Sequence, residues 1–231
     1  TQSPSSAASD VYKRQLISYS RPPIIGEINE DLQELIAYCA RVSNPSNQNN
    51  TKTSEKLLRY LAKHKHWSPF EMVSVNLEIE TTRDIARQIL RHRSFSFQEF
   101  SQRYADPVEE LEFTLREARL QDQKNRQNSI ATKDVDLQMG WLKEQSKVWN
   151  QAKKSYEWAI ENGIAKEVAR AVLPEGLTNS RLYVHGTIRS WIHFIELRSA
   201  NGTQKESIEI AQACAAVIGD IFPLIKEYCH E

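Results

Sequence analysis

The residues best suited to chemistry lie in one stretch of thirteen. Arg91, His92 and Arg93 stand in a row, and seven residues later Ser101 and Arg103 follow. Guanidinium groups bind phosphate and carboxylate oxygens bidentately, so several of them close together predict a site for an anion of defined geometry. This segment is therefore the first candidate for a functional site.

The charge of the whole chain gives no reason to expect a polyanionic partner. Lys and Arg number 30, as do Asp and Glu, so the formal net charge is zero. Residues 83–103 differ from this average, because they hold five arginines against one aspartate and one glutamate. An anion site must therefore be local, and this segment supplies it.

Two other interpretations of the cluster stay open from the residues alone. A run of arginines is often a solvated surface, although Phe95, Phe97 and Phe100 alternate through this one and make full solvation costly. Arginines mixed with aromatic rings also suit single-stranded nucleic acid, whose bases stack on such rings. The alternative function is thus a nucleic-acid-binding module that uses the loop 91–104.

A metal-dependent hydrolase is a weaker alternative. His64 and His66 are the only closely spaced histidine pair outside the cluster, and no H-E-x-x-H pattern accompanies them. Metalloenzymes of this kind bring several histidine and carboxylate ligands together. We therefore expect no metal site.

The spacing of apolar residues predicts the elements that position the cluster. Helical spacing predicts helices over 30–42, 54–65, 82–92, 140–162, 164–172, 180–199 and from a Thr203-x-x-Glu206 capping box toward the C-terminus, with a kink at Pro223. Strands are predicted over 16–20, 73–80 and 108–115, and a polar excursion over 116–139. The cluster would begin on the last turn of a helix and continue into a loop.

These elements predict an α+β fold, a single domain in which a small, mostly antiparallel sheet packs with several long helices. Residues 1–14 are rich in Ser and Ala and lack the apolar core of a signal peptide, so we expect a non-native or disordered tail, with the domain over 15–231. Three widely spaced cysteines favour a reducing, cytoplasmic location. No apolar run approaches the roughly 20 residues that span a bilayer, so no membrane partner is expected.

Four ordered motifs resemble those of the flavin-dependent thymidylate synthases, the ThyX family. Residues 91–103 are similar to its signature R-H-R-x7-S-x-R, with every fixed position filled. Residues 66–71 resemble H-x-[ST]-P-[FL]-E, residues 169–174 resemble A-R-x-x-L-P, and residues 189–198 resemble R-S-x3-F-x3-R. The resemblance extends over about 16–229.

The resemblance implies a ThyX-like fold and a reaction. In that reaction dUMP is methylated to dTMP, with 5,10-methylenetetrahydrofolate as carbon donor, FAD as cofactor and NADPH as reductant. It also implies a homotetramer whose active sites are shared between subunits, and no nucleic-acid partner.

The resemblance also implies roles for individual residues. The substrate dUMP would be bound by Gln88, Arg91, Glu99, Phe100, Ser101, Gln102, Arg103, Arg170 and Arg198. The flavin would be bound by Ser68, Arg91, His92, Arg93, Glu99, Thr187, Ile188, Arg189 and His193. His66 and Tyr104 would lie near the folate. Many relatives have Asn at the positions of Thr187 and His193, and both residues here can still hydrogen-bond a flavin.

The cysteines indicate how the pyrimidine would be activated. Cys39, Cys214 and Cys229 all lie outside the four motifs, on apolar stretches where a structural thiol is expected. An enzyme without a thiolate nucleophile must polarise the ring by electrostatics and leave the redox step to a cofactor. The resemblance places Arg198 as the catalytic residue, stabilising negative charge on the N3/O2 side of the uracil.

Overall fold

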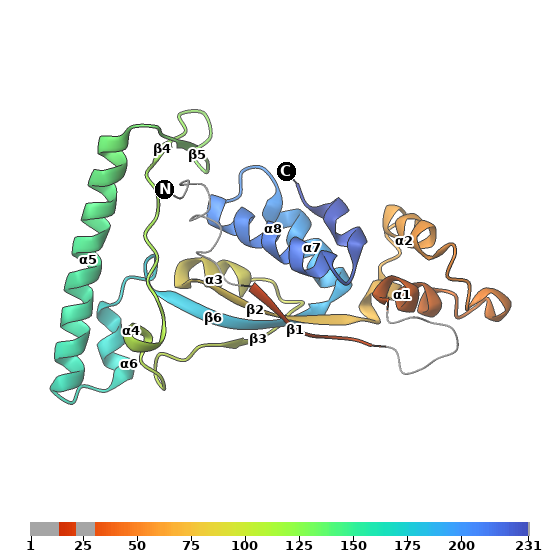
Figure 1. The fold of residues 1–231 in the computed structure, drawn as a ribbon, viewed down its shortest axis with the longest axis horizontal. Helices are drawn as coiled ribbons and strands as arrows, with labels where there is room; N and C mark the ends of the chain where they lie inside the picture. The colour runs from red at the N-terminus through yellow and green to blue at the C-terminus, as the bar shows by residue number, and fades with distance from the viewer. Residues whose placement is uncertain (1–13, 22–30, 231) are drawn as a thin grey trace, which may run out of the picture.

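An antiparallel sheet with strand order β1-β2-β6-β3 forms the centre of the computed structural model (Figure 1). Its strands are β1 (Arg14–Tyr19), β2 (Ser74–Thr82), β6 (Asn179–Thr187) and β3 (Ser96–Glu99). The structure describes residues 14–21 and 31–230. The tail predicted over 1–14 therefore lies outside the described residues except for Arg14, which pairs with Ile79 at the start of β1. The predicted α+β class with a small antiparallel sheet is confirmed.

One face of the sheet is apolar and covered by helices. Val75, Leu77 and Ile79 of β2 alternate with polar residues and are fully buried. The helices α7 (Ile188–Ser199) and α8 (Lys205–Gly219) lie over this face (Figure 1). Trp191 of α7 is also fully buried, and its indole N–H donates to the carbonyl oxygen of Val75 at 3.1 Å. This bond satisfies a buried donor and fixes α7 against the sheet.

The topology brings the ends of two helices together. β2 and β6 are antiparallel, so the helices that follow them, α3 (Arg83–Ile89) and α7, begin at opposite ends of the sheet. Both helices return over the same face, and a hydrogen bond joins Arg198 near the carboxyl end of α7 to Gln88 near that of α3 (Figure 1). The strand order therefore determines which residues meet there.

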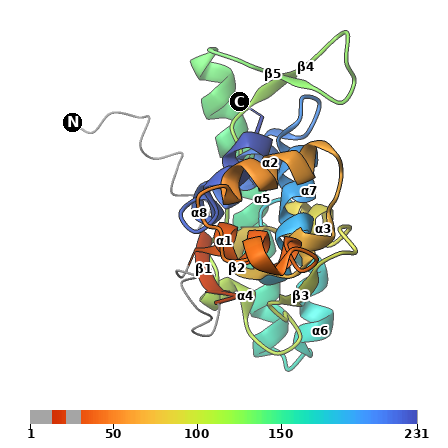
Figure 2. The same cartoon turned by 90° about the vertical axis from the view of Figure 1, so that its right-hand side faces the viewer.

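The remaining elements flank this centre. Two helices lie at one end of the sheet, α1 (Leu32–Ala40) and α2 (Ser54–Lys63), and the long α5 (Val135–Glu161) lies at the other end (Figure 1). A hairpin of β4 (Arg119–Gln121) and β5 (Ser129–Ala131) lies on the side of the sheet that α8 covers (Figure 2). The short helices are α4 (Pro107–Glu110), α6 (Lys166–Ala169) and the 3-10 turns Pro45–Asn47, Ser68–Glu71, Arg170–Val172 and Pro223–Tyr228. Among the described residues, no helix combines the length and the apolarity that crossing a bilayer requires.

The helix predicted over 180–199 is wrong in its first half. Residues Asn179–Thr187 form β6, with inward and outward side chains in alternation, and the helix begins only at Ile188. Val184, Ile188, Trp191 and Ile195 are spaced by four, three and four residues, so helical periodicity continues backward across the true boundary. The boundary is set by Thr187, whose hydroxyl accepts from the backbone N–H of Ser190 at 3.3 Å as an N-cap.

The strand predicted over 108–115 is also wrong. Asp106 caps the short helix α4, which begins at Pro107, and only an isolated bridge pairs Phe113 with Thr178. The loop predicted after Arg93 instead contains strand β3. Phe97 packs against the core while its neighbours face outward, which is the alternation of a strand.

Three further boundaries differ from the prediction. The polar excursion contains the β4–β5 hairpin and ends where Asp134 caps α5, five residues before the predicted start. Gln204 replaces the predicted Thr203 at the N-cap of α8, and its side chain makes no capping bond to the helix backbone. α8 ends at Gly219, and a separate 3-10 turn follows from Pro223.

Candidate active site

Arg198 is fixed where the carboxyl ends of α3 and α7 meet. Its Nε–H donates to Nε2 of His92 at 2.9 Å, and one terminal nitrogen donates to the carbonyl oxygen of Gln88 at 3.0 Å. Burial, then the charge of nearby Arg91, lowers the pKa of Arg198. Arginine stays protonated even so, which leaves a positive charge in a half-buried position. We call Gln88, His92 and Arg198 the anchored cluster.

The side-chain amide of Gln88 is already in use. It donates to Oε1 of Gln204 at 2.8 Å and accepts from the hydroxyl of Ser207 at 3.0 Å. Gln88 therefore ties α3 to the first turn of α8. Sequence reasoning missed Gln204 and Ser207, and only their three-residue spacing at a helix start hinted at a shared polar face.

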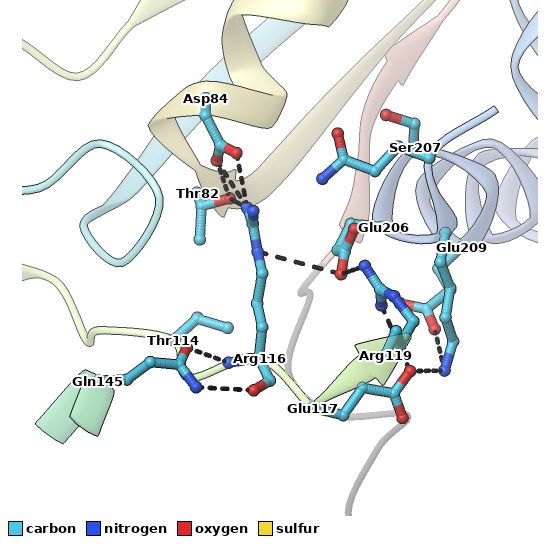
Figure 3. Close-up of polar contacts among 12 residues, drawn as sticks. Thr82, Asp84, Thr114, Arg116, Glu117, Arg119, Gln145, Glu206, Ser207 and Glu209 are labelled. Carbon is cyan, nitrogen blue, oxygen red and sulfur yellow. Dashed lines mark hydrogen bonds and ion pairs between the residues drawn. The ribbon is translucent and has the colours of Figure 1, made fainter. Parts of the chain in front are cut away.

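The segment that leads to β4 anchors the amino ends of α3 and α8 (Figure 3). Arg116 donates to both carboxylate oxygens of Asp84 at 2.7 and 2.8 Å, and Arg119 binds the buried carboxylate of Glu206 at 2.7 Å. Gln145 of α5 accepts from the N–H of Arg116 and donates to its carbonyl oxygen. The amino end of α3 and the first turn of α8, to which Gln88 is bonded, are thus fixed by ion pairs that sequence reasoning did not anticipate.

His92 is the buried member of the Arg-His-Arg sequence. Its side chain packs edge-on against Phe194, with ring centroids 5.0 Å apart, and its own exposed fraction is 8%. Burial, then the charges of Arg198 and His193, lowers the pKa of His92 to about 4. Arg91 and Arg93 on either side are exposed. The structure therefore separates the histidine from its two neighbours.

A cavity of about 760 Å³ lies beside the cluster, between α7 and the 66–72 connection. The residues expected to contact flavin that line it are Thr187, Arg189 and His193, and the wall also includes Trp67 and Ile192. Arg189 is ion-paired with Glu71, the last residue of the 66–71 motif. Glu71 is a residue that the sequence reasoning left without a role, although its motif already contained it.

Three other expected ligand contacts lie near this cavity without lining it. Ser68 begins the 3-10 turn that contains Glu71, and His66 is exposed just before it. Ile188 is fully buried, so its side chain belongs to the core and only its backbone lies at the start of α7.

The second part of the signature forms a separate hollow. Ser101, Arg103 and Tyr104 line a depression of about 440 Å³ with Lys166 and Glu167. We call Ser101–Tyr104 the signature turn. Arg103 donates to Glu167 at 2.9 Å, and Lys166 donates to the carbonyl oxygen of Tyr104 at 3.2 Å.

Within the signature turn, Gln102 is 4% exposed, and its buried amide nitrogen has no hydrogen-bond partner among the described residues. A buried donor left without a partner is costly. The turn thus has hydrogen-bonding capacity that this chain does not use.

The last three predicted residues lie between these places. Glu99 accepts from Ser180 at 2.9 Å and lies 3.6 Å from Arg83, so it orients an arginine of α3. The N–H of Phe100 donates to the carbonyl oxygen of Arg181, which continues the β3–β6 pairing. Arg170, half-buried, begins the 3-10 turn after α6.

Burial makes two of the three cysteine thiols less acidic. Cys214 is fully buried in α8, and burial raises the pKa of its thiol to about 12. Burial also raises the pKa of Cys39. Neither thiol is activated as a nucleophile.

Comparison with known proteins agrees with the motifs. Residues 25–224 match the family model Thy1, described as "Thymidylate synthase complementing protein". The chain is 52% identical over 213 residues to a "Probable flavin-dependent thymidylate synthase" of Paramecium bursaria Chlorella virus 1, covering 92% of this chain and 96% of the relative. It is 47% identical over 213 residues to a "Flavin-dependent thymidylate synthase" of Synechocystis sp., covering 91% and 96%.

The fold has a solved counterpart. The crystal structure of the UMP/dUMP methylase PolB from Streptomyces cacaoi bound with 5-Br dUMP superposes with a TM-score of 0.75, at 24% identity, over 94% of this chain and 93% of that one. The likeness confirms the ThyX-like architecture. Given the family match over most of the chain and two relatives aligned over nearly their full length, this protein belongs to the Thy1 family of flavin-dependent thymidylate synthases.

Proposed function

We propose that the chain catalyses the FAD-dependent reductive methylation of dUMP to dTMP, with 5,10-methylenetetrahydrofolate as carbon donor and NADPH as reductant. The observation that carries the proposal is the position of Arg198, whose charge is fixed beside the Arg-His-Arg sequence at the meeting point of α3 and α7. A preorganised cation of this kind stabilises negative charge that develops during a reaction. The names of the full-length relatives support the same activity.

The cavity beside α7 suits a flavin. Its volume lies within the range of roughly 300–1,000 Å³ typical of small-molecule sites. Trp67 and Ile192 supply an apolar wall, and Thr187, Arg189 and His193 supply polar groups for ring and phosphate oxygens. We assign FAD to this cavity, with Ser68 and Arg93 at its margin. When bound, FAD supplies the electrons that reduce the transferred carbon to a methyl group.

The arginines outside the cavity suit the nucleotide. Arg91, Arg103 and Arg170 can neutralise the phosphate, and the hydroxyl of Ser101 can donate to it. Arg198 would donate to the O2/N3 side of the uracil and stabilise the charge that forms there when C5 becomes nucleophilic. His66 and Tyr104, both exposed, are assigned to the folate.

No cysteine is proposed to act covalently. The buried thiol of Cys214 stays protonated at neutral pH, since its pKa is raised to about 12. Cys39 and Cys229 lie outside the four motifs. The ring is thus activated by charge and hydrogen bonds rather than by a thiolate.

We propose that the working site is completed between subunits of a homotetramer. Within one chain, Ser101, Arg103 and Tyr104 of the signature turn line a depression of about 440 Å³, and no residue of the anchored cluster lines it. The unpaired amide of Gln102 supports the proposal, because a neighbouring chain or the nucleotide can satisfy it.

The single-stranded nucleic-acid alternative needs exposed rings in the loop 91–104. Phe95 is instead buried, with its ring centroid 4.6 Å from that of Trp191. Among the described residues, no group of three or more His, Cys, Asp or Glu is arranged to hold a metal ion, so the hydrolase alternative gains no support.

The test uses the purified full-length chain. It should carry a flavin that is released on denaturation and identified as FAD by chromatography. With dUMP, methylenetetrahydrofolate and NADPH it should form dTMP, and omission of any one of them should stop turnover. Absence of flavin together with tight, salt-sensitive binding of single-stranded oligonucleotides would reject the proposal in favour of the alternative.

A further inference from the structure

The hydrogen bond between Arg198 and His92 determines the state of the imidazole. A guanidinium is always protonated, so its Nε can only donate. Nε2 of His92, 2.9 Å away, must therefore be the acceptor and carries no proton. A neutral histidine then has its proton on Nδ1, and this tautomer follows from the geometry alone.

The ring of His92 is held in place by packing. Phe194 contacts it edge-on at 5.0 Å between centroids, and Phe95 lies 6.2 Å away. The backbone N–H of His92 donates to the carbonyl oxygen of Ile89 at 3.0 Å, which continues the turn of α3. The acceptor that meets Arg198 is thus on a rigid support.

The two bonds of Arg198 also determine which donors remain. Nε–H and one N–H of a terminal nitrogen are used by His92 and Gln88, which leaves the end of the guanidinium with three of its five N–H groups. A planar pair of N–H groups from the two terminal nitrogens remains to meet a flat, oxygen-bearing ring edge.

We infer that His92 is a positioning residue, which in its neutral Nδ1–H form holds Arg198 so that the end of the guanidinium faces the pyrimidine. This role rests on the proposed function and differs from the flavin contact that the family resemblance implies. Nε2 cannot serve the flavin while it accepts from Arg198.

The charges around His92 favour this state. Arg198 and His193 face it from α7, and Arg91, next to it in the chain, acts on Arg198 from the same turn. The charges of Arg198 and His193 disfavour protonation of His92. Burial adds to their effect, so the acceptor persists at neutral pH.

The first test compares two variants of the holoenzyme. His92→Leu removes the acceptor and keeps an apolar side chain, while His92→Gln places an amide oxygen near the former Nε2. We expect His92→Leu to lower kcat about ten- to a hundredfold, with FAD occupancy retained, and His92→Gln to restore most of it. Unchanged kcat in His92→Leu, or equal losses in both folded variants, would overturn the inference.

A double-mutant cycle tests whether His92 acts through Arg198. In an Arg198→Lys background the guanidinium is gone, so His92→Leu should cost less than about threefold in kcat. A full-sized further loss in that background would mean that His92 acts on something else.

A measurement on the unmodified protein separates this inference from the proposed reaction. Nitrogen-15 spectra of histidine-labelled protein should show His92 neutral at pH 7 with its proton on Nδ1, whether or not dTMP is formed. Protonation on Nε2, or a charged ring at pH 7, would refute the inference while leaving the reaction intact. Failure to form dTMP with the expected tautomer would reject the reaction and leave the hydrogen bond standing.

Discussion

The anchored cluster and the signature turn carry parts of the same proposed site but are built differently. In the anchored cluster, Gln88, His92 and Arg198 bond to one another or to α8, and ion pairs fix the amino ends of α3 and α8. In the signature turn, Arg103 is two-thirds exposed and pairs with the exposed Glu167, while the buried amide nitrogen of Gln102 has no partner in the described part of the chain. The anchored cluster is thus preorganised within the chain, whereas the signature turn has hydrogen-bond donors that a ligand or a second subunit can bind. Substitutions should accordingly affect turnover in the first region and affinity in the second.

The largest effect is expected for Arg198→Lys. Lysine keeps the charge but lacks the planar fork that bonds to His92 and Gln88 and that we propose to meet the pyrimidine. We expect the variant to fold, retain flavin and lose turnover by on the order of 10²-fold or more. Steady-state kinetics at saturating dUMP, folate and NADPH measure this. Near-normal turnover would place Arg198 outside catalysis and remove the main contrast between the regions.

Substitution of the exposed arginines is expected to have a smaller effect, which falls on ligand binding. Arg103→Ala should weaken dUMP binding about ten- to a hundredfold with flavin retained, because a charge-assisted bond to the nucleotide is lost. Arg93→Ala should instead lower FAD occupancy. Calorimetry with dUMP and flavin absorbance distinguish the two.

Arg59→Ala is the matched control, since Arg59 is an exposed arginine paired with Glu227 outside every motif. Arg59→Ala should change neither the affinity for dUMP nor the FAD occupancy. Equal damage to both ligands by Arg93→Ala and Arg103→Ala would indicate a structural network in place of separate contacts.

A pH-dependent change in stability is expected from the anchored cluster. The pKa of His92 is about 6.5 in the unfolded chain and is lowered to about 4 in the folded chain. Between these values the unfolded state binds more protons, so stability falls as the pH falls through this window. Urea unfolding midpoints should show this decline in the native protein and a shallower one in His92→Gln. Identical slopes would mean that His92 is not buried as a neutral base.

The smallest effect is expected when all thiols are removed. A protein with Cys39→Ser, Cys214→Ala and Cys229→Ser has lost every sulfur nucleophile and, at Cys214, gains no buried hydroxyl. It should form dTMP within about threefold of the native rate, provided that it folds, because the proposed activation of the uracil ring needs no thiolate. Retained flavin with abolished turnover would return the enzyme to thiolate catalysis.

Local patterns predicted much of the fold. The alternation in β2 and the helical spacing of α1, α2 and α3 are each set by neighbours in the sequence, and these elements agree with the prediction to within a few residues. The prediction was wrong for β6 for a physical reason. Val184 continues the apolar spacing of α7, and the Thr187 cap marks the boundary between strand and helix. Propensity cannot place such a boundary when one apolar stripe serves two elements.

The motifs named the residues that we propose for the site, but they did not predict the contacts among these residues. The resemblance of the motifs to those of the family named Arg198, Arg189 and His92 from residue type and spacing alone. The bond between Arg198 and His92 joins residues 106 positions apart, and the ion pair of Arg189 with Glu71 spans 118. Contacts over such distances depend on the register of the sheet, which no short window contains.

The pairing of β2 with β6 also determines at what stage of folding the proposed site forms. Gln88 and Arg198 lie 110 positions apart, so their contact requires closure of a long loop whose entropic cost precedes any gain from the contact. Parts assembled from such distant segments form slowly during folding. A growing chain on the ribosome will already display the complete Arg-His-Arg signature as an unpartnered basic segment while α7 is still unmade. The chain therefore acquires its charged sequence early in synthesis, and the catalytic arrangement only near the end.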